Sequence, residues 1–148
     1  MTLMRHVLAM VVIGLVITKD AHADDALQGL AVSKGLNGNL DADAKRTLAA
    51  FTVAAARTGS IRVWIAFDMV FVGDSTLRTA EVSYQESLVK QELIDRVVMP
   101  LVNDGYAELP PQPLPGAPGC ELFVSTRALS QLARSEDVTF IGYLGSVH

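Results

Sequence analysis

The sequence is poor in the residues from which catalytic and metal sites are built. It holds one cysteine, one tryptophan and three histidines in 148 residues. The single Cys120 excludes an internal disulfide framework, so apolar burial has to hold the core together. After the N-terminal processing described below, His148 is the only histidine left, which excludes a Cys/His metal cluster and a triad with an oriented imidazole.

Nucleotide-binding motifs are absent as well. There is no GxGxxG and no phosphate loop with Gly-Lys-Ser/Thr. The adjacent acids Glu136 and Asp137 fall in a helix-to-strand turn, where carboxylates usually act as solvated caps. We therefore predict a protein that is not an enzyme and that uses neither a cofactor nor a metal.

The charge balance is acidic. Twelve Lys and Arg residues face sixteen Asp and Glu residues, for a formal net charge of −4 at pH 7. A chain of this kind has no reason to seek nucleic acid or an anionic lipid surface. We expect a monomer with neither partner.

The first 23 residues have the pattern of a signal peptide. Arg5 precedes an apolar run over residues 7–17, and Ala21, His22 and Ala23 form the small-x-small pattern that signal peptidase reads. The run is shorter than the about 20 apolar residues of a membrane span. The sequence thus predicts export to the periplasm or the extracellular space, with an uncleaved anchor as the alternative.

Three segments follow the signal peptide. Residues 24–40 are small, polar and glycine-containing, and we interpret them as a flexible lead-in. Residues 41–59 predict an N-terminal helix that is capped by Asp41 or Asn39 and ends at Gly59. Residues 60–148 form the main domain.

The most strand-like run of that domain is Ile61–Phe67, where large apolar residues alternate with Arg62, Trp64 and Ala66. A second helix is predicted to begin near Thr79. Pro100 should kink or end it because proline lacks an N–H donor.

Four apolar residues of this second helix fall close to one face, and Val89, Ile94 and Val98 widen it. They predict a buried stripe that includes Tyr84, Leu88, Leu93 and Val97. We expect all of these side chains in the core.

Short strands are predicted at residues 106–109, 121–125 and 138–141, with a proline-rich loop after the first and a short helix after the second. The order strand, helix, strand, strand, helix, strand predicts the α+β class. The arrangement it favours is ferredoxin-like (βαββαβ), an antiparallel sheet with two helices on one face, here with an extra N-terminal helix. Its first and third strands are central, and its fourth lies beside the first.

The alternation of the strands divides their side chains between two faces. If Val63 and Ile65 face the helices, then Trp64, Phe123 and Phe140 lie together on the opposite, open face. Aromatic patches of this kind mark partner surfaces. The alternative is that the N-terminal helix folds across this face and buries the rings.

Several stretches resemble the propeptides of subtilisin-like serine proteases, a family that includes freestanding protease inhibitors. The resemblance is carried by residues 62–67, by Gln85 and Leu88 in the long helix, and by residues 122–132 and 135–141. It covers roughly residues 61–148. It implies a ferredoxin-like domain that binds its protease through the open sheet face and through a C-terminal tail.

In that family the tail enters the substrate cleft as an added strand. Carried over, the resemblance implies a docking face of Trp64, Phe123 and Phe140 and a tail that consists of Tyr143, Leu144, Gly145, Ser146, Val147 and His148. The family's acidic residues after the last strand are replaced here by Gly142, Tyr143 and Leu144.

No protease domain follows in this sequence, so we expect action in trans on a subtilisin-like serine protease. The first hypothesis is a secreted inhibitor whose tail occupies the cleft. The alternatives are a folding assistant for a separately encoded protease and a periplasmic interaction module with no protease partner.

Overall fold

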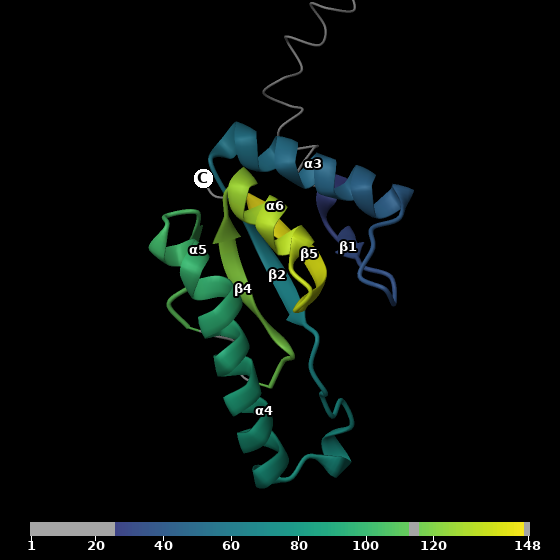
Figure 1. Ribbon diagram of the computed structural model, residues 1–148, viewed down its shortest axis with the longest axis vertical. Coiled ribbons are helices and arrows are strands. Elements are labelled where there is room, and N and C mark those ends of the chain that lie inside the picture. The colour runs from purple at the N-terminus through teal and green to yellow at the C-terminus, as the bar shows by residue number, and fades with distance from the viewer. Residues whose placement is uncertain (1–25, 113–115, 147–148) are drawn as a thin grey trace, which may run out of the picture.

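The computed structural model describes residues 26–112 and 116–146. Within them the chain is of the α+β class, with a five-stranded antiparallel sheet (Figure 1). The strands are β1 (Ala31–Ser33), β2 (Ile61–Phe67), β3 (Ala107–Glu108), β4 (Gly119–Val124) and β5 (Val138–Ser146). The helices are α3 (Ala42–Thr58), η1 (Ser75–Leu77), α4 (Ala80–Leu93), η2 (Ile94–Val98), α5 (Met99–Asn103) and α6 (Thr126–Arg134). The expected signal peptide lies outside the described residues.

The sheet is built around β2, whose predicted bounds are confirmed. The strand order is β1-β5-β2-β4-β3, so β2 pairs with β4 on one side and with β5 on the other. Its residues Ile61, Val63 and Ile65 are completely buried. Each such side chain contributes about 1.5–3 kcal/mol relative to an exposed one.

Gly119 permits the close approach of β4 to β2. A Cβ atom at this position would lie 1.7 Å from the carbonyl oxygen of Ile65. No other residue fits there without a shift of the backbone.

The lead-in contains a strand that the sequence analysis missed. β1 pairs antiparallel with β5, with Val32 opposite Ile141, and Val32 is fully buried. The interpretation of residues 24–40 as a flexible lead-in is therefore wrong for this segment. Three residues with one buried side chain are too few to show a period of two.

The N-terminal helix α3 begins where predicted, because the Asp41 carboxylate accepts a hydrogen bond of 2.7 Å from the Ala44 N–H. It crosses one end of the sheet and packs against α6 and β1 (Figure 1). Its buried Phe51 lies 5.6 Å from the ring of Tyr143, centroid to centroid. Tyr143 stands opposite the buried Val63, so α3 covers the face that the other helices cover. The alternative in which it closes the opposite face is excluded.

The second helix buries a different stripe from the one predicted. Leu93 is buried, but Tyr84 and Leu88 are 61% and 49% exposed, so the prediction of a continuous core stripe is wrong. Figure 1 shows the N-terminal part of α4 projecting beyond the sheet.

Leu88 and Leu93 are five positions apart in α4, so in a regular helix they face directions about 140° apart and do not share one side. After Leu93 comes η2, a π-helical segment in which the Met99 N–H bonds to the Ile94 carbonyl. It precedes Pro100, which cannot donate a hydrogen bond. A π-turn is wider than an α-turn by about one residue. It therefore rotates the residues after it relative to those of α4. Pro100 does not end the helical stretch, which goes on through Asn103.

Candidate functional site

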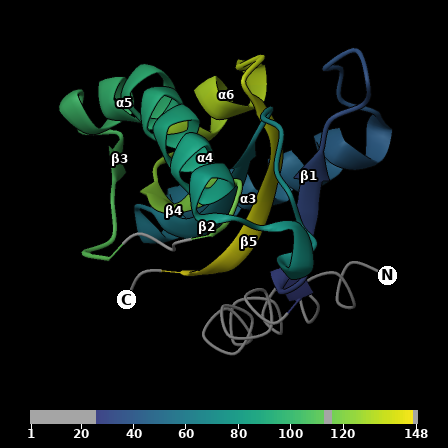
Figure 2. The same ribbon diagram turned by 90° about the horizontal axis from the view of Figure 1, so that it is seen from below.

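The sheet face opposite the helices carries a pair of aromatic rings. α4 and α6 lie together on one side of the sheet (Figure 2), and Trp64 and Phe140 on the other side remain partly exposed. Their centroids are 5.6 Å apart and their planes meet at 69°, a favourable edge-to-face geometry. The two rings thus form one preformed apolar surface.

Gly142 makes room for this ring pair. It stands opposite Trp64 in the register of β2 and β5. A Cβ atom on Gly142 would lie 2.8 Å from Cε1 of Phe140. The Phe140 ring therefore lies against the glycine backbone, where a larger residue would displace it.

An ion pair separates the ring pair from Phe123. Arg62 stands opposite Phe123, and Trp64 stands opposite Glu121. The Nε and Nη2 groups of Arg62 donate to Oε2 of Glu121 at 2.9 and 2.6 Å. The Arg62 side chain is 47% exposed and that of Glu121 13%.

The predicted docking residues Trp64, Phe123 and Phe140 are therefore on one face, with a charged pair in the middle of it. Strand alternation already indicated that Arg62 lies there. Its pairing with Glu121 depends on the register of β2 against β4, which the sequence does not state. A surface ion pair of this kind adds little to stability. It does make the middle of this otherwise aromatic face charged.

The predicted cleft-binding tail is not free. Residues 143–146 belong to β5, where Tyr143 pairs with Val63 and Ser146 with Ile61. Tyr143 is only 3% exposed, and its hydroxyl lies 2.9 Å from Oγ of Ser146. The backbone N–H of Tyr143 also donates to the Leu30 carbonyl at 3.1 Å.

The interpretation of Tyr143, Leu144, Gly145 and Ser146 as a tail that follows the last strand is therefore wrong. Val147 and His148 lie outside the described residues. The sequence hid the strand because its alternation breaks at a register shift between Arg62 and Val63. Gly142 and Gly145 also lower strand propensity.

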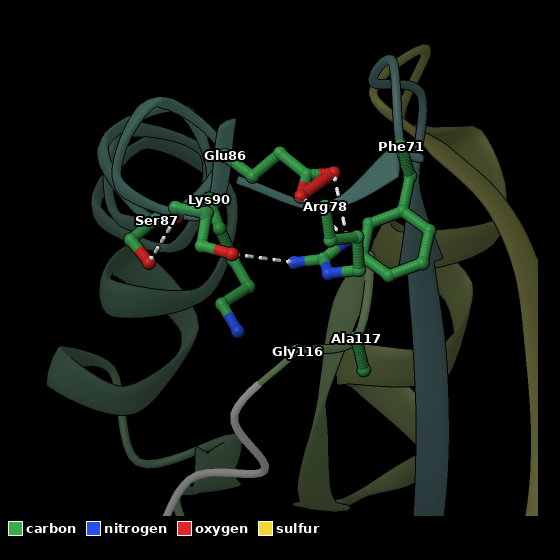
Figure 3. Close-up of a pocket in the computed structure, with 8 residues that line it drawn as sticks. Phe71, Arg78, Glu86, Ser87, Lys90, Gly116 and Ala117 are labelled. Carbon is green, nitrogen blue, oxygen red and sulfur yellow. Dashed lines mark hydrogen bonds and ion pairs between the residues drawn. The ribbon is translucent and has the colours of Figure 1, made fainter. Parts of the chain in front are cut away.

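A cavity of about 360 Å³ lies between α4 and the segment after β2 (Figure 3). Nη1 of Arg78 lies 2.7 Å from Oε1 of Glu86 and donates to the Val72 carbonyl at 2.7 Å. Oε2 of Glu86 accepts from the Val72 N–H at 3.0 Å. Oε1 is buried and has no hydrogen bond of good geometry, so charge attraction to Arg78 is what stabilises it. The guanidinium also stacks on Phe71, 4.7 Å from the ring centroid.

The polar groups of this cavity are thus largely directed at one another. Arg78 and Glu86 fasten the segment after β2 to the projecting part of α4. We interpret the cluster as a structural tether, and sequence reasoning missed it because the two residues belong to segments with no shared period.

Two further titratable groups, one buried and one partly buried, have shifted pKa values. Burial raises the pKa of the Cys120 thiol to about 12, so it stays protonated near neutral pH and is a poor nucleophile. Burial lowers the pKa of the Lys34 ammonium. Its Nζ donates to the carbonyl oxygens of Leu132 and Ser135, at the end of α6 where a cation is favoured. Both groups serve the fold.

In the part of the chain that the structure describes, no helix is both long and apolar enough to span a bilayer. The same residues contain no group of three His, Cys, Asp or Glu side chains placed to hold a metal ion. Comparisons of the chain with protein-family models, curated proteins and solved structures gave no match.

Proposed function

We propose that this protein binds a subtilisin-type serine protease in trans, and that it docks through the open sheet face of Trp64, Phe123 and Phe140. The proposal rests on the resemblance of residues 61–148 to the propeptides of that protease family. It is supported by the order β5-β2-β4-β3 with antiparallel neighbours. This is the order of a ferredoxin-like sheet, and β1 adds a fifth strand at its edge.

One observation carries the proposal: an aromatic surface that the fold itself does not need. Core rings of this protein are sealed, as Phe51 is at 0% exposure. Trp64, Phe123 and Phe140 remain partly exposed although they stand on the three central strands β2, β4 and β5. Rigid aromatic side chains of this kind supply contact area at low entropic cost.

The anchored end of β5 bears on how such a protein acts. A cleft inhibitor needs Tyr143 to leave both Val63 and the ring of Phe51 before the tail can reach a protease. A folding assistant needs no such release, because docking through the sheet face suffices. The paired state of β5 therefore favours the folding assistant as the second candidate.

The test uses a broad subtilisin-type protease in three forms. A catalytically inactive form measures binding, an active form measures inhibition, and a denatured form measures recovery of activity. The variant Trp64→Thr/Phe140→Thr removes the rings and keeps residues that favour strands. Val53→Gln on α3, where Val53 is 56% exposed, is the matched control.

We expect the inactive protease to bind the original protein and the Val53→Gln variant alike, and the ring variant at least about tenfold more weakly. Recovery of the denatured protease without lasting inhibition would identify a folding assistant. Inhibition that survives the loss of both rings would overturn the docking face. Absence of binding would leave an exported interaction module without a protease partner.

A further inference from the structure

The outward side of α4 carries apolar side chains that the fold leaves uncovered. Tyr84 and Leu88 are 61% and 49% exposed, and the neighbouring Val89 is 42% exposed. Residues four apart lie one above the other on a helix, so Tyr84 and Leu88 form a short stripe. Glu86 and Lys90 line the cavity on the inner side, so the stripe faces away from the body of the protein.

Acidic residues continue the stripe at both ends. Glu81 lies three positions before Tyr84, Glu92 lies four after Leu88, and Asp95 lies seven after Leu88. All three are exposed. They surround the apolar pair with negative charge.

The two cations of this helical stretch offset that charge only in part. Lys90 lines the inner cavity. Arg96 donates to both carboxylate oxygens of Asp137, at 3.2 and 2.9 Å, and lies 3.7 Å from Glu92. It therefore partly neutralises Glu92 while it is held toward the turn before β5. The outer side of α4 is thus an apolar stripe with an acidic rim.

This charge pattern selects among possible occupants. In an antiparallel pair of α4 helices centred on Leu88, Glu81 of one copy faces Asp95 of the other, and like charges oppose the contact. An anionic lipid surface is repelled in the same way. A helix with apolar residues on one side and Lys or Arg beside them is able to pack on the apolar stripe and to form ion pairs with the acidic rim.

We propose that the outer side of α4, formed by Tyr84, Leu88 and the acids Glu81, Glu92 and Asp95, binds a basic amphipathic helix of a partner protein. This surface is separate from the open sheet face and does not depend on the function proposed for it. α4 lies on the other side of the sheet (Figure 2), so the two surfaces are able to hold different partners at once.

The experiment compares two synthetic peptides of about five helical turns. Both have leucine on one face at spacings of three and four. All other positions are lysine in one peptide and glutamate in the other. Binding to the purified protein is measured by fluorescence anisotropy at two salt concentrations.

The lysine peptide is expected to bind at least about tenfold more tightly than the glutamate peptide, and less tightly at high salt. Tyr84→Gln/Leu88→Gln should weaken its binding by about tenfold. Val53→Gln, an equally exposed change on α3, should have no effect. Because all of these residues are exposed, circular dichroism should show unchanged folds.

Equal binding of the two peptides would overturn the proposal, as would lysine-peptide binding that Tyr84→Gln/Leu88→Gln leaves unchanged. Sedimentation equilibrium tests the other possible occupant, which is a second copy of this chain. A dimer that Leu88→Gln dissociates would assign this surface to a second copy of the chain and refute the basic partner.

Discussion

The tether between Arg78 and Glu86 makes a quantitative prediction about stability. Their side chains are 19% and 11% exposed, and Glu86 also accepts the Val72 N–H at 3.0 Å. Glu86→Ala leaves that N–H without its acceptor and the guanidinium without its counter-charge. Breaking a fully buried pair costs about 3–5 kcal/mol. Because both groups keep some contact with water, we expect about 2–3 kcal/mol.

A double-mutant cycle with Arg78→Ala, Glu86→Ala and the combined variant isolates the pair. Unfolding in urea is followed by the fluorescence of Trp64, the single tryptophan. We expect a coupling energy of about 1–3 kcal/mol. For a domain of this size, each kcal/mol also lowers the melting temperature by about 2–4 °C.

Two observations would refute this reasoning. One is additivity, in which the combined variant costs the sum of the single variants. The other is an equal coupling energy in the control pair Arg46 and Asp43. Their side chains are 73% and 83% exposed, so we expect no measurable coupling energy between them. Amide exchange of residues 70–78 distinguishes local release of the segment from global loss of stability.

Three further predictions concern buried positions. Gly119→Ala should destabilise strongly in urea unfolding because its Cβ would meet the Ile65 carbonyl, whereas Gly73→Ala, with nothing within 4 Å, should be nearly neutral. Phe51→Ala should cost about 3–5 kcal/mol, and Val53→Ala on the exposed side should lie within about 0.5 kcal/mol of zero. Cys120 should resist alkylation by iodoacetamide until urea unfolds the chain. Because its pKa is raised from 9.0 to about 12, its contribution to stability is complete below pH 9 and is lost as the pH rises toward 12.

Local patterns predicted the elements whose side chains obey one simple period. β2 was predicted with its observed bounds because seven residues alternate without interruption. The helix starts at Asp41 and near Thr79 were also predicted, because each side chain accepts a hydrogen bond from a backbone N–H within its own first turn.

Features that depend on pairing between distant segments were not predictable in this way. β1 exists because Val32 fills a place beside Ile141, and three residues carry no period of their own. The predicted stripe of α4 failed because it joined Leu88 to Leu93, which are five positions apart, and because the N-terminal part of the helix projects beyond the sheet. Strand alternation predicted that Trp64, Phe123 and Phe140 share one face of the sheet, as they do. The ion pair between Arg62 and Glu121 was not predictable, because it depends on the strand register.

Residues 143–146 are paired in β5, so any role that needs a free C-terminal segment must first supply the free energy to release them. Releasing residues 143–146 exposes Tyr143, at about 2 kcal/mol, and breaks ladder hydrogen bonds worth about 1 kcal/mol each. A release that costs about 4 kcal/mol weakens cleft binding by about a thousandfold. Phe51→Ala removes the ring that holds Tyr143 and so lowers this cost. If the tail is the inhibitor, that variant should inhibit a subtilisin-type protease better than the original protein despite its lower stability. If the sheet face is the binding surface, its inhibition should not rise.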